Sequence, residues 1–161
     1  MRLMFLALLA ATSVQAQEKV AFFGMFMLDN SLQTARLGTD LAETARLALL
    51  EEMIADQFTS EGYFLVDTEP ARVEMDRVVN LAKCYGCDTR IATNLGADYS
   101  LVGEVQKVSN LILTINLQMR ASDTGELVKG GVVDIRGNTD ETWTRGMRYI
   151  LKNRIFVREE K

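Results

Sequence analysis

The segment 111–120 alternates between apolar and polar side chains, and this pattern constrains the fold more than any other stretch of the chain. Its apolar positions are Leu111, Leu113, Ile115, Leu117 and Met119, and its polar positions are Thr114, Asn116, Gln118 and Arg120. Successive side chains of a strand point to opposite faces, so the alternation predicts a strand with one buried and one wetter face. Such a strand needs neighbours in a sheet and a layer that covers its apolar face.

Segments on either side of this strand have the pattern of further strands. Residues 99–108 precede it across a turn at 109–110, and residues 126–136 follow it across Asp123-Thr124-Gly125. Turn residues between three successive strands predict an antiparallel meander. Gly130-Gly131 lies inside the third strand and indicates a bulge or a close approach of another backbone.

The amino-terminal half predicts a strand, a long helix and a second strand. Residues 19–28 are apolar enough for a buried strand, and residues 63–67 form a shorter one. Between them, Asp40 followed by Glu43 predicts the cap of an amphipathic helix that ends near Ser60. Its core face comprises Leu47, Leu50, Ile54 and Phe58, and its solvated face Glu51, Glu52 and Asp56. The two strands should pair in parallel.

The remaining segments complete the order β-α-β-α-α-β-β-β-α. Residues 76–83 are weakly helical, Asp88 is expected to cap a short helix that ends near Leu95, and a last helix begins within 137–140. The core face of that last helix comprises Trp143, Met147, Ile150 and Leu151. We therefore predict an α/β fold with one mixed sheet of about five strands.

Residues 1–16 have the pattern of a secretory signal peptide. Arg2 provides a positive start, the next nine residues are apolar, and Val14-Gln15-Ala16 suits cleavage after Ala16. The apolar run is shorter than the roughly 20 residues that a spanning helix needs. We predict export to the bacterial periplasm and a single domain over residues 17–161, with no lipid anchor and no transmembrane segment.

Composition excludes several classes of function. The formal net charge is −4, whereas nucleic-acid binding requires a basic surface. The chain contains no histidine, which excludes Ser-His-Asp and Cys-His catalysis in their usual forms, and histidine metal sites. The acidic residues form no evident catalytic pair, and methionines such as Met25, Met53, Met119 and Met147 fit core positions better than a copper site. We therefore predict no catalytic residues, no metal and no cofactor.

Cys84 and Cys87 are the only cysteines. Two nearby cysteines in an exported protein usually pair, so we predict a structural disulfide that pins the turn between two short helices. A thiol–disulfide exchange centre is the alternative, because a Cys-x-x-Cys spacing lowers the pKa of a thiol. A metal site would need further strong ligands, and Asp88 stands where haem attachment would require histidine.

The segment from Arg136 to Trp143 also allows two interpretations. Asn138 or Thr139 can cap the last helix, which is a purely structural role. Arg and Trp are, however, residue types that anchor interfaces. Arg136, Asn138, Asp140 and Trp143 are therefore our candidates for partner binding.

Several phrases resemble a known group of envelope proteins. They are Leu95-Gly96-Ala97-Asp98-Tyr99 leading into 101–105, Asp123-Thr124-Gly125-Glu126, and 64–67 after a long helix. This pattern is similar to the periplasmic α/β module of the TolB amino-terminal domain, the CsgG-like curli secretion proteins and the LpoB-type lipoproteins. With Cys84-x-x-Cys87 and 136–143 added, it resembles a bacterial family of predicted periplasmic proteins of unknown function.

The resemblance implies an α/β domain that binds partners in the cell envelope without catalysis. Pore formation is not implied, because the chain lacks the extra segments of curli secretion proteins. We therefore predict a soluble periplasmic accessory or adaptor domain that binds another cell-envelope protein. The alternative is a thiol–disulfide oxidoreductase or redox sensor that uses Cys84 and Cys87.

Overall fold

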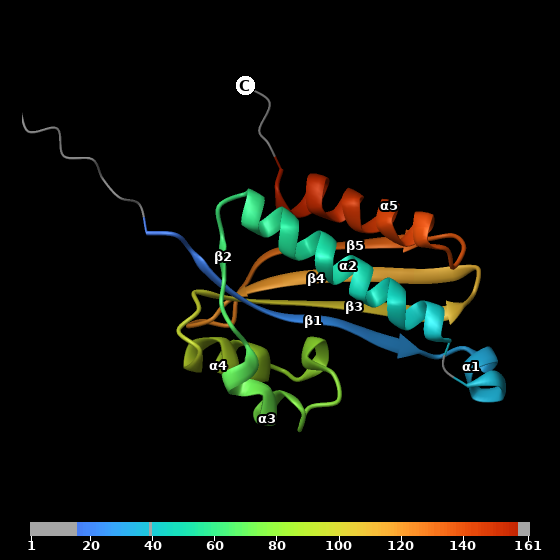
Figure 1. The fold of residues 1–161 in the computed structure, drawn as a ribbon, viewed down its shortest axis with the longest axis horizontal. Coiled ribbons are helices and arrows are strands. Elements are labelled where there is room, and N and C mark those ends of the chain that lie inside the picture. Colours follow the sequence, from blue (N-terminus) through green and yellow to red (C-terminus); the bar gives the residue numbers. More distant parts are fainter. Residues whose placement is uncertain (1–15, 39, 158–161) are drawn as a thin grey trace, which may run out of the picture.

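The computed structural model describes residues 16–38 and 40–157, so the predicted signal peptide lies, except for Ala16, outside the described residues. The described chain forms one mixed sheet with helices on both faces (Figure 1). The strands are β1 (Lys19–Asp29), β2 (Phe64–Leu65), β3 (Tyr99–Ser109), β4 (Ile112–Ala121) and β5 (Leu127–Ile135). The helices are α1 (Leu32–Leu37), α2 (Leu41–Ser60), α3 (Arg72–Met75), α4 (Cys87–Asn94) and α5 (Asp140–Ile150). The predicted α/β class is confirmed.

The sheet has the strand order β2-β1-β3-β4-β5. Strand β1 pairs in parallel with β2 on one side and with β3 on the other, and Val20 lies opposite both Leu65 and Tyr99. Strands β3, β4 and β5 form the predicted antiparallel meander, in which Leu117 lies opposite Gly103 and Gly131. The parallel pairing of the first two strands is thus also confirmed.

The larger core lies between the sheet and the helices α2 and α5. The alternation of β4 places Leu113, Ile115, Leu117 and Met119 in this core with no exposed surface, whereas Leu111 is 72% exposed because it precedes the strand. Helix α2 contributes Leu50, Ile54 and Phe58, and the carboxyl-terminal helix contributes Trp143, Met147, Ile150 and Leu151. Both predicted core faces are confirmed.

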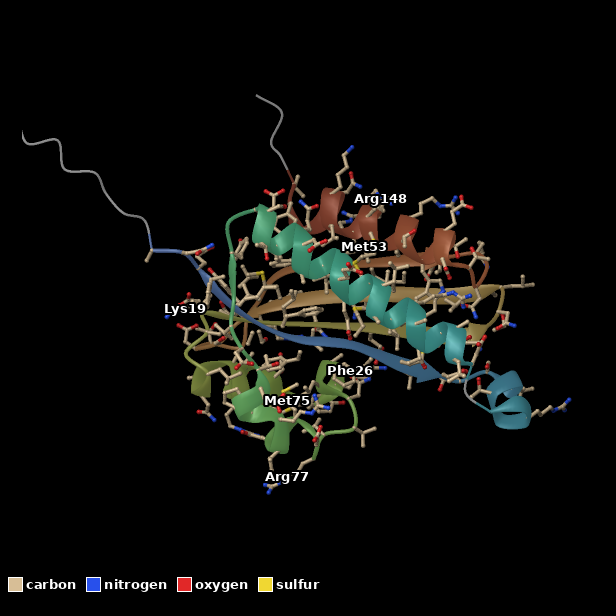
Figure 2. All side chains as sticks on the ribbon, in the orientation of Figure 1. Lys19, Phe26, Met53, Met75, Arg77 and Arg148 are labelled. Carbon is tan, nitrogen blue, oxygen red and sulfur yellow. A yellow bond between two sulfur atoms is a disulfide. The ribbon has the colours of Figure 1, made fainter. Side chains whose placement is uncertain are left out.

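A smaller core covers the opposite face of β1 and β3. Ala21, Phe23 and Val102 pack there against Ile91 of α4 and against Leu81 of a short 3-10 helix, η2 (Leu81–Lys83). Phe26 and Met75 also lie on this side, while Met53 lies on the α2 side (Figure 2). This second layer is built from short helices and turns, and it carries the two cysteines.

Close packing of side chains from the carboxyl-terminal helix explains one of the two adjacent glycines in β5, Gly131. A Cβ atom on Gly131 would lie 2.8 Å from Cγ2 of Ile150 and 2.8 Å from Cβ of Arg154. The carboxyl-terminal helix, which continues as η3 (Leu151–Ile155), therefore packs directly on the strand. The predicted close contact is found at Gly131 alone, and side chains rather than another backbone make it; a Cβ on Gly130 would approach no atom more closely than 3.4 Å.

Local capping differs from the sequence-based expectation in two helices. Asp40 does cap α2, but Glu43 is buried and does not complete a capping box. Helix α4 begins at Cys87 after Gly86, whose φ is 100°, so the prediction that Asp88 caps this helix is wrong. The side chains of Glu43 and Asp88 instead point into the protein, where they contact the buried polar side chains of Lys107 and Ser100, respectively.

Three further details differ from the prediction. Helix α1 was not expected, and it forms because Ser31 accepts a hydrogen bond from the backbone N–H of Thr34. The helix expected at 76–83 is replaced by α3 and η2, which lie on either side of an irregular stretch. Glu51 is not simply solvated, because its Oε1 accepts a 2.8 Å hydrogen bond from the backbone N–H of Met25 at an irregularity of β1.

Candidate functional site

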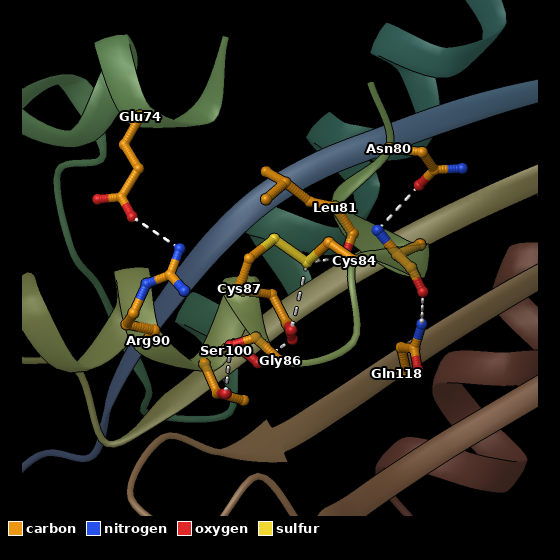
Figure 3. Close-up of a disulfide and its surroundings, with 12 residues drawn as sticks. Glu74, Asn80, Leu81, Cys84, Gly86, Cys87, Arg90, Ser100 and Gln118 are labelled. Atoms are coloured by element: carbon orange, nitrogen blue, oxygen red, sulfur yellow. Dashed lines mark hydrogen bonds and ion pairs between the residues drawn. A yellow bond between two sulfur atoms is a disulfide. The ribbon is translucent and has the colours of Figure 1, made fainter. Parts of the chain in front are cut away.

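The two cysteines form a disulfide that closes the sharp turn between η2 and α4 (Figure 3). Their Cα atoms are 5.5 Å apart. Cys87 is the first residue of α4 and is almost buried, whereas Cys84 is partly exposed. The disulfide therefore ties a surface loop to the smaller core.

Tyr85 projects from this loop into solvent. Its side chain is completely exposed, and its φ of 55° is in the left-handed region. A bulky residue rarely adopts this conformation, because it costs strain energy and persists only where the surrounding structure imposes it. Here Gly86 follows with a φ of 100°, and the disulfide closes the turn around both residues. The loop thus holds an aromatic side chain outward.

A groove of about 830 Å³ lies beside the loop. One wall is η2 and the start of α4, including Lys83 and Thr89, and the other is the turn from β4 to β5, including Asp123. Arg120 also lines it and is fixed by hydrogen bonds from its guanidinium to the carbonyl oxygen of Gly125 and to Oε1 of Gln118. The groove is therefore polar and carries charges of both signs.

Buried polar side chains lie beneath the disulfide. Asp88 is 3% exposed, and its Oδ2 accepts a 2.8 Å hydrogen bond from Oγ of Ser100, which has no exposed surface. Oδ1 of Asp88 lies 3.9 Å from Sγ of Cys84. A disulfide sulfur carries no hydrogen and cannot donate to this oxygen. Oδ1 thus faces the disulfide without a hydrogen-bond donor among the described residues.

Glu104 extends this polar floor along β3. Its Oε2 accepts a 2.6 Å hydrogen bond from Nδ2 of Asn80, and its Oε1 lies 3.1 Å from Nζ of Lys83. Gln118 donates from Nε2 to the carbonyl oxygen of Ala82 (Figure 3). These contacts fix η2 against the sheet. The sequence analysis did not predict these contacts, although Ser100 and Glu104 share one face of a predicted strand with the apolar Val102.

Three of the four candidate partner-binding residues belong to an internal network at the start of α5. Trp143 has no exposed surface, and its Nε1 donates a 2.9 Å hydrogen bond to Oδ1 of Asn138. Asp140 is exposed, and its Oδ1 accepts a 2.7 Å hydrogen bond from Nε of Arg46 on α2. Thr139 provides the helix cap. Arg136 is exposed and lies outside this network.

The same network continues to a buried ion pair. Nδ2 of Asn138 and Nζ of Lys107 each lie 2.6 Å from Oε1 of Glu43. Lys107 and Glu43 are each 3% exposed, and Nζ of Lys107 also lies 3.5 Å from Oδ2 of Asp29. The sequence indicates Glu43 only as a capping residue, and its pairing with Lys107 depends on the tertiary contact between α2 and β3.

Electrostatics at this ion pair favour the charged forms. Burial alone would raise the pKa of Asp29, but hydrogen bonds from Ser31 and Thr34 and the charge of Lys107 lower it to about 2. Burial opposes the charge of Lys107, yet its hydrogen bond with Glu43 and the charges of Glu43 and Asp29 raise its pKa above the usual value. The cluster is thus a structural connection between α2, β1, β3 and α5.

Within residues 16–38 and 40–157, no three cysteine, aspartate or glutamate side chains are grouped so as to hold a metal ion. None of the helices described there combines the length and the apolarity that crossing a bilayer requires.

Solved structures with a similar fold include the LpoB C-terminal domain from Salmonella enterica. It is 19% identical, with a TM-score of 0.53, and the match covers 77% of this chain and 86% of that one. The LpoB C-terminal domain from Escherichia coli is 20% identical, with a TM-score of 0.49, over 79% of this chain and 88% of that one. The first likeness confirms an LpoB-like fold, whereas the resemblance to TolB and CsgG-like proteins stays a prediction.

Among curated proteins, none matches the chain. The family DUF3280, whose description reads "Protein of unknown function (DUF2380)", matches residues 18–155 and thus nearly all of the described structure. The chain belongs to this family.

Proposed function

We propose that the protein is an exported accessory module that binds another protein of the bacterial cell envelope and catalyses no reaction. The LpoB-like fold and the resemblance of its sequence motifs to periplasmic proteins support this assignment. The predicted signal peptide supports the location, and cleavage after Ala16 would release residues 17–161 into the periplasm.

The observation that carries the proposal is the outward position of Tyr85. Interface anchors are enriched in tyrosine, and they bind most tightly when little conformational freedom is lost on association. The disulfide and the left-handed backbone already restrict the loop that bears Tyr85. The adjacent polar groove would supply hydrogen bonds around the aromatic anchor.

Site-specific photo-crosslinking in living cells tests this proposal. A photoreactive amino acid at position 85 should give one discrete product with an envelope protein, whereas the same amino acid at Leu41, which is 84% exposed at the start of α2, should give none. Equal products from both positions, no product from position 85, or a product that contains only a second copy of this chain would contradict the proposal.

Binding measured with the captured protein then assigns the anchor. Tyr85→Ala should weaken binding by more than about tenfold, as expected for an interface hot spot, and Tyr85→Phe should retain most of the affinity. Arg136 is exposed and shortly precedes α5. The Arg136→Ala protein therefore tests whether the surface at the start of α5 contributes to binding as well. Unchanged affinity in the Tyr85→Ala protein would remove Tyr85 from the proposed interface.

A further inference from the structure

The strongest unexplained feature of the structure is the buried carboxylate of Asp88 beneath the disulfide. Its Oδ2 is hydrogen-bonded to Ser100, but its Oδ1 faces Sγ of Cys84 at 3.9 Å with no hydrogen to accept. A buried polar atom without a partner costs free energy, and the cost is larger for a charged group. The oxidised state therefore leaves a penalty that the protein can relieve.

Reduction of the disulfide relieves this penalty. The reduced Cys84 carries an S–H group, and two acceptors lie within reach of its present sulfur position, the carbonyl oxygen of Leu81 at 3.3 Å and Oδ1 of Asp88 at 3.9 Å. Oδ1 of Asp88 belongs to a carboxylate, and hydrogen bonds to a charged acceptor are stronger than those to a neutral one. The other product of reduction, Cys87, is the first residue of α4, where the backbone N–H groups of the helix stabilise a thiolate. The surroundings of both sulfur atoms therefore stabilise the reduced dithiol, which would not be expected around an inert structural disulfide.

We propose that Cys84 and Cys87 form an exchangeable thiol–disulfide site for a protein or low-molecular-weight thiol, and that Asp88 stabilises its reduced form by accepting the thiol hydrogen of Cys84. This inference concerns the bond that restricts the loop bearing Tyr85, but it does not require Tyr85 to bind a partner. It makes Asp88 a positioning residue, because it acts through the thiol of Cys84 and contacts no reacting partner.

The exchange takes place in two steps. A thiolate attacks Sγ of Cys84, the more exposed sulfur, and forms a mixed disulfide while Cys87 leaves as a thiolate. A second thiolate attacks the sulfur of the first reagent, so that Cys84 leaves and takes up a proton from water. The reagent ends as its disulfide, and the two electrons that it loses leave Cys84 as a thiol and Cys87 as a thiolate, which becomes a thiol when it takes up a second proton from water.

Equilibration of the folded, mature protein with glutathione redox buffers tests the inference. The Asp88→Asn protein should show an equilibrium constant for reduction about tenfold lower than that of the unaltered protein, which corresponds to a potential about 30 mV more negative. Ser100→Ala is the matched control. It removes the other hydrogen bond of Asp88 and leaves the charge, so this constant should not fall.

Two results would overturn the inference. One is an equal or higher reduction constant in the Asp88→Asn protein, and the other is a disulfide that stays oxidised in a glutathione buffer of cytosolic composition. If Asp88→Asn does not fold, Cys87→Ala and Cys84→Ala/Cys87→Ala can be compared instead under reducing conditions. The free thiol of Cys84 in the first protein should donate to Asp88 and make unfolding in urea about tenfold less favourable than in the alanine pair. Equal stability of these two proteins would also reject the role of Asp88.

Discussion

Nζ of Lys107 lies 2.6 Å from Oε1 of Glu43, and this buried ion pair joins the middle of the sheet to the first turn of α2. Asn138 shares the same carboxylate oxygen, so the start of α5 is attached to the pair as well. The cluster thereby connects α2, β1, β3 and the start of α5. The charged groups of Glu43, Asp29 and Lys107 and the amide of Asn138 hold these separate elements together.

Removing one partner of this pair should be strongly destabilising. Lys107→Met leaves the carboxylate of Glu43 buried with only Asn138 as a donor, and we expect a loss of about 3–5 kcal/mol in the free energy of unfolding. Urea denaturation monitored by circular dichroism measures this loss. Glu141→Gln, which removes an ion pair between exposed side chains of Arg145 and Glu141, should cost less than about 1 kcal/mol. Similar losses in both variants would contradict the assignment.

Asp29 should make stability depend on pH in the acid range. Its pKa in the folded protein is about 2, below the value of 3.8 for an unperturbed aspartate. The folded state therefore favours the carboxylate, and this contribution is complete above pH 3.8 and disappears as the pH falls through about 2. At neutral pH it amounts to about 2 kcal/mol.

Urea unfolding at a series of pH values checks this expectation. The Asp29→Asn protein should be less stable than the unaltered protein at neutral pH, and the difference should shrink as the pH falls toward 2. A difference that is constant over this range would show that the charge of Asp29 does not contribute.

Truncation of Trp143 should have a large effect because its side chain has no exposed surface. Trp143→Ala should lower the free energy of unfolding by about 3–5 kcal/mol. Trp143→Phe keeps an aromatic ring but loses the hydrogen bond to Asn138, and it should cost less. Differential scanning calorimetry measures both changes, and an unchanged melting temperature for Trp143→Ala would contradict the core position of Trp143.

The adjacent glycines of β5 should respond differently to alanine. A Cβ on Gly131 would lie 2.8 Å from Ile150 and Arg154, whereas a Cβ on Gly130 would approach no atom more closely than 3.4 Å. Gly131→Ala should therefore destabilise by about 1–3 kcal/mol through overpacking. Gly130→Ala, which lies in the same strand, should have a much smaller effect on thermal unfolding. Equal effects would show that packing of the carboxyl-terminal helix is not the reason for glycine at position 131.

Local patterns were sufficient to predict most of the elements. The alternation of 113–119 predicted β4, and the apolar positions of α2 and α5 predicted their buried faces, because both patterns depend only on the direction of side chains within one element. Short segments were predicted less well. Helix α1 and the irregular stretch around η2 depend on single capping contacts and on packing against β3.

The candidate site shows the same division. The spacing of Cys84 and Cys87 indicated a disulfide, but not the outward side chain of Tyr85 or the buried carboxylate of Asp88 beneath the sulfur. Likewise, Asn138, Asp140 and Trp143 stood out as a group, but their hydrogen bonds to one another and to α2 and their differing exposure were not apparent.

The sequence by itself determined the α/β class, the order of the strands along the chain, the buried faces of the long helices and the pairing of the two cysteines, because these depend on periodicity and on spacing within short segments. Only the tertiary structure decided that Glu43 meets Lys107, that Asp88 lies under the disulfide and that the buried Trp143 donates a hydrogen bond to Asn138. Those relationships join residues that are distant in sequence, and the free energy of a buried charge or polar atom depends on which partner the folded chain brings to it.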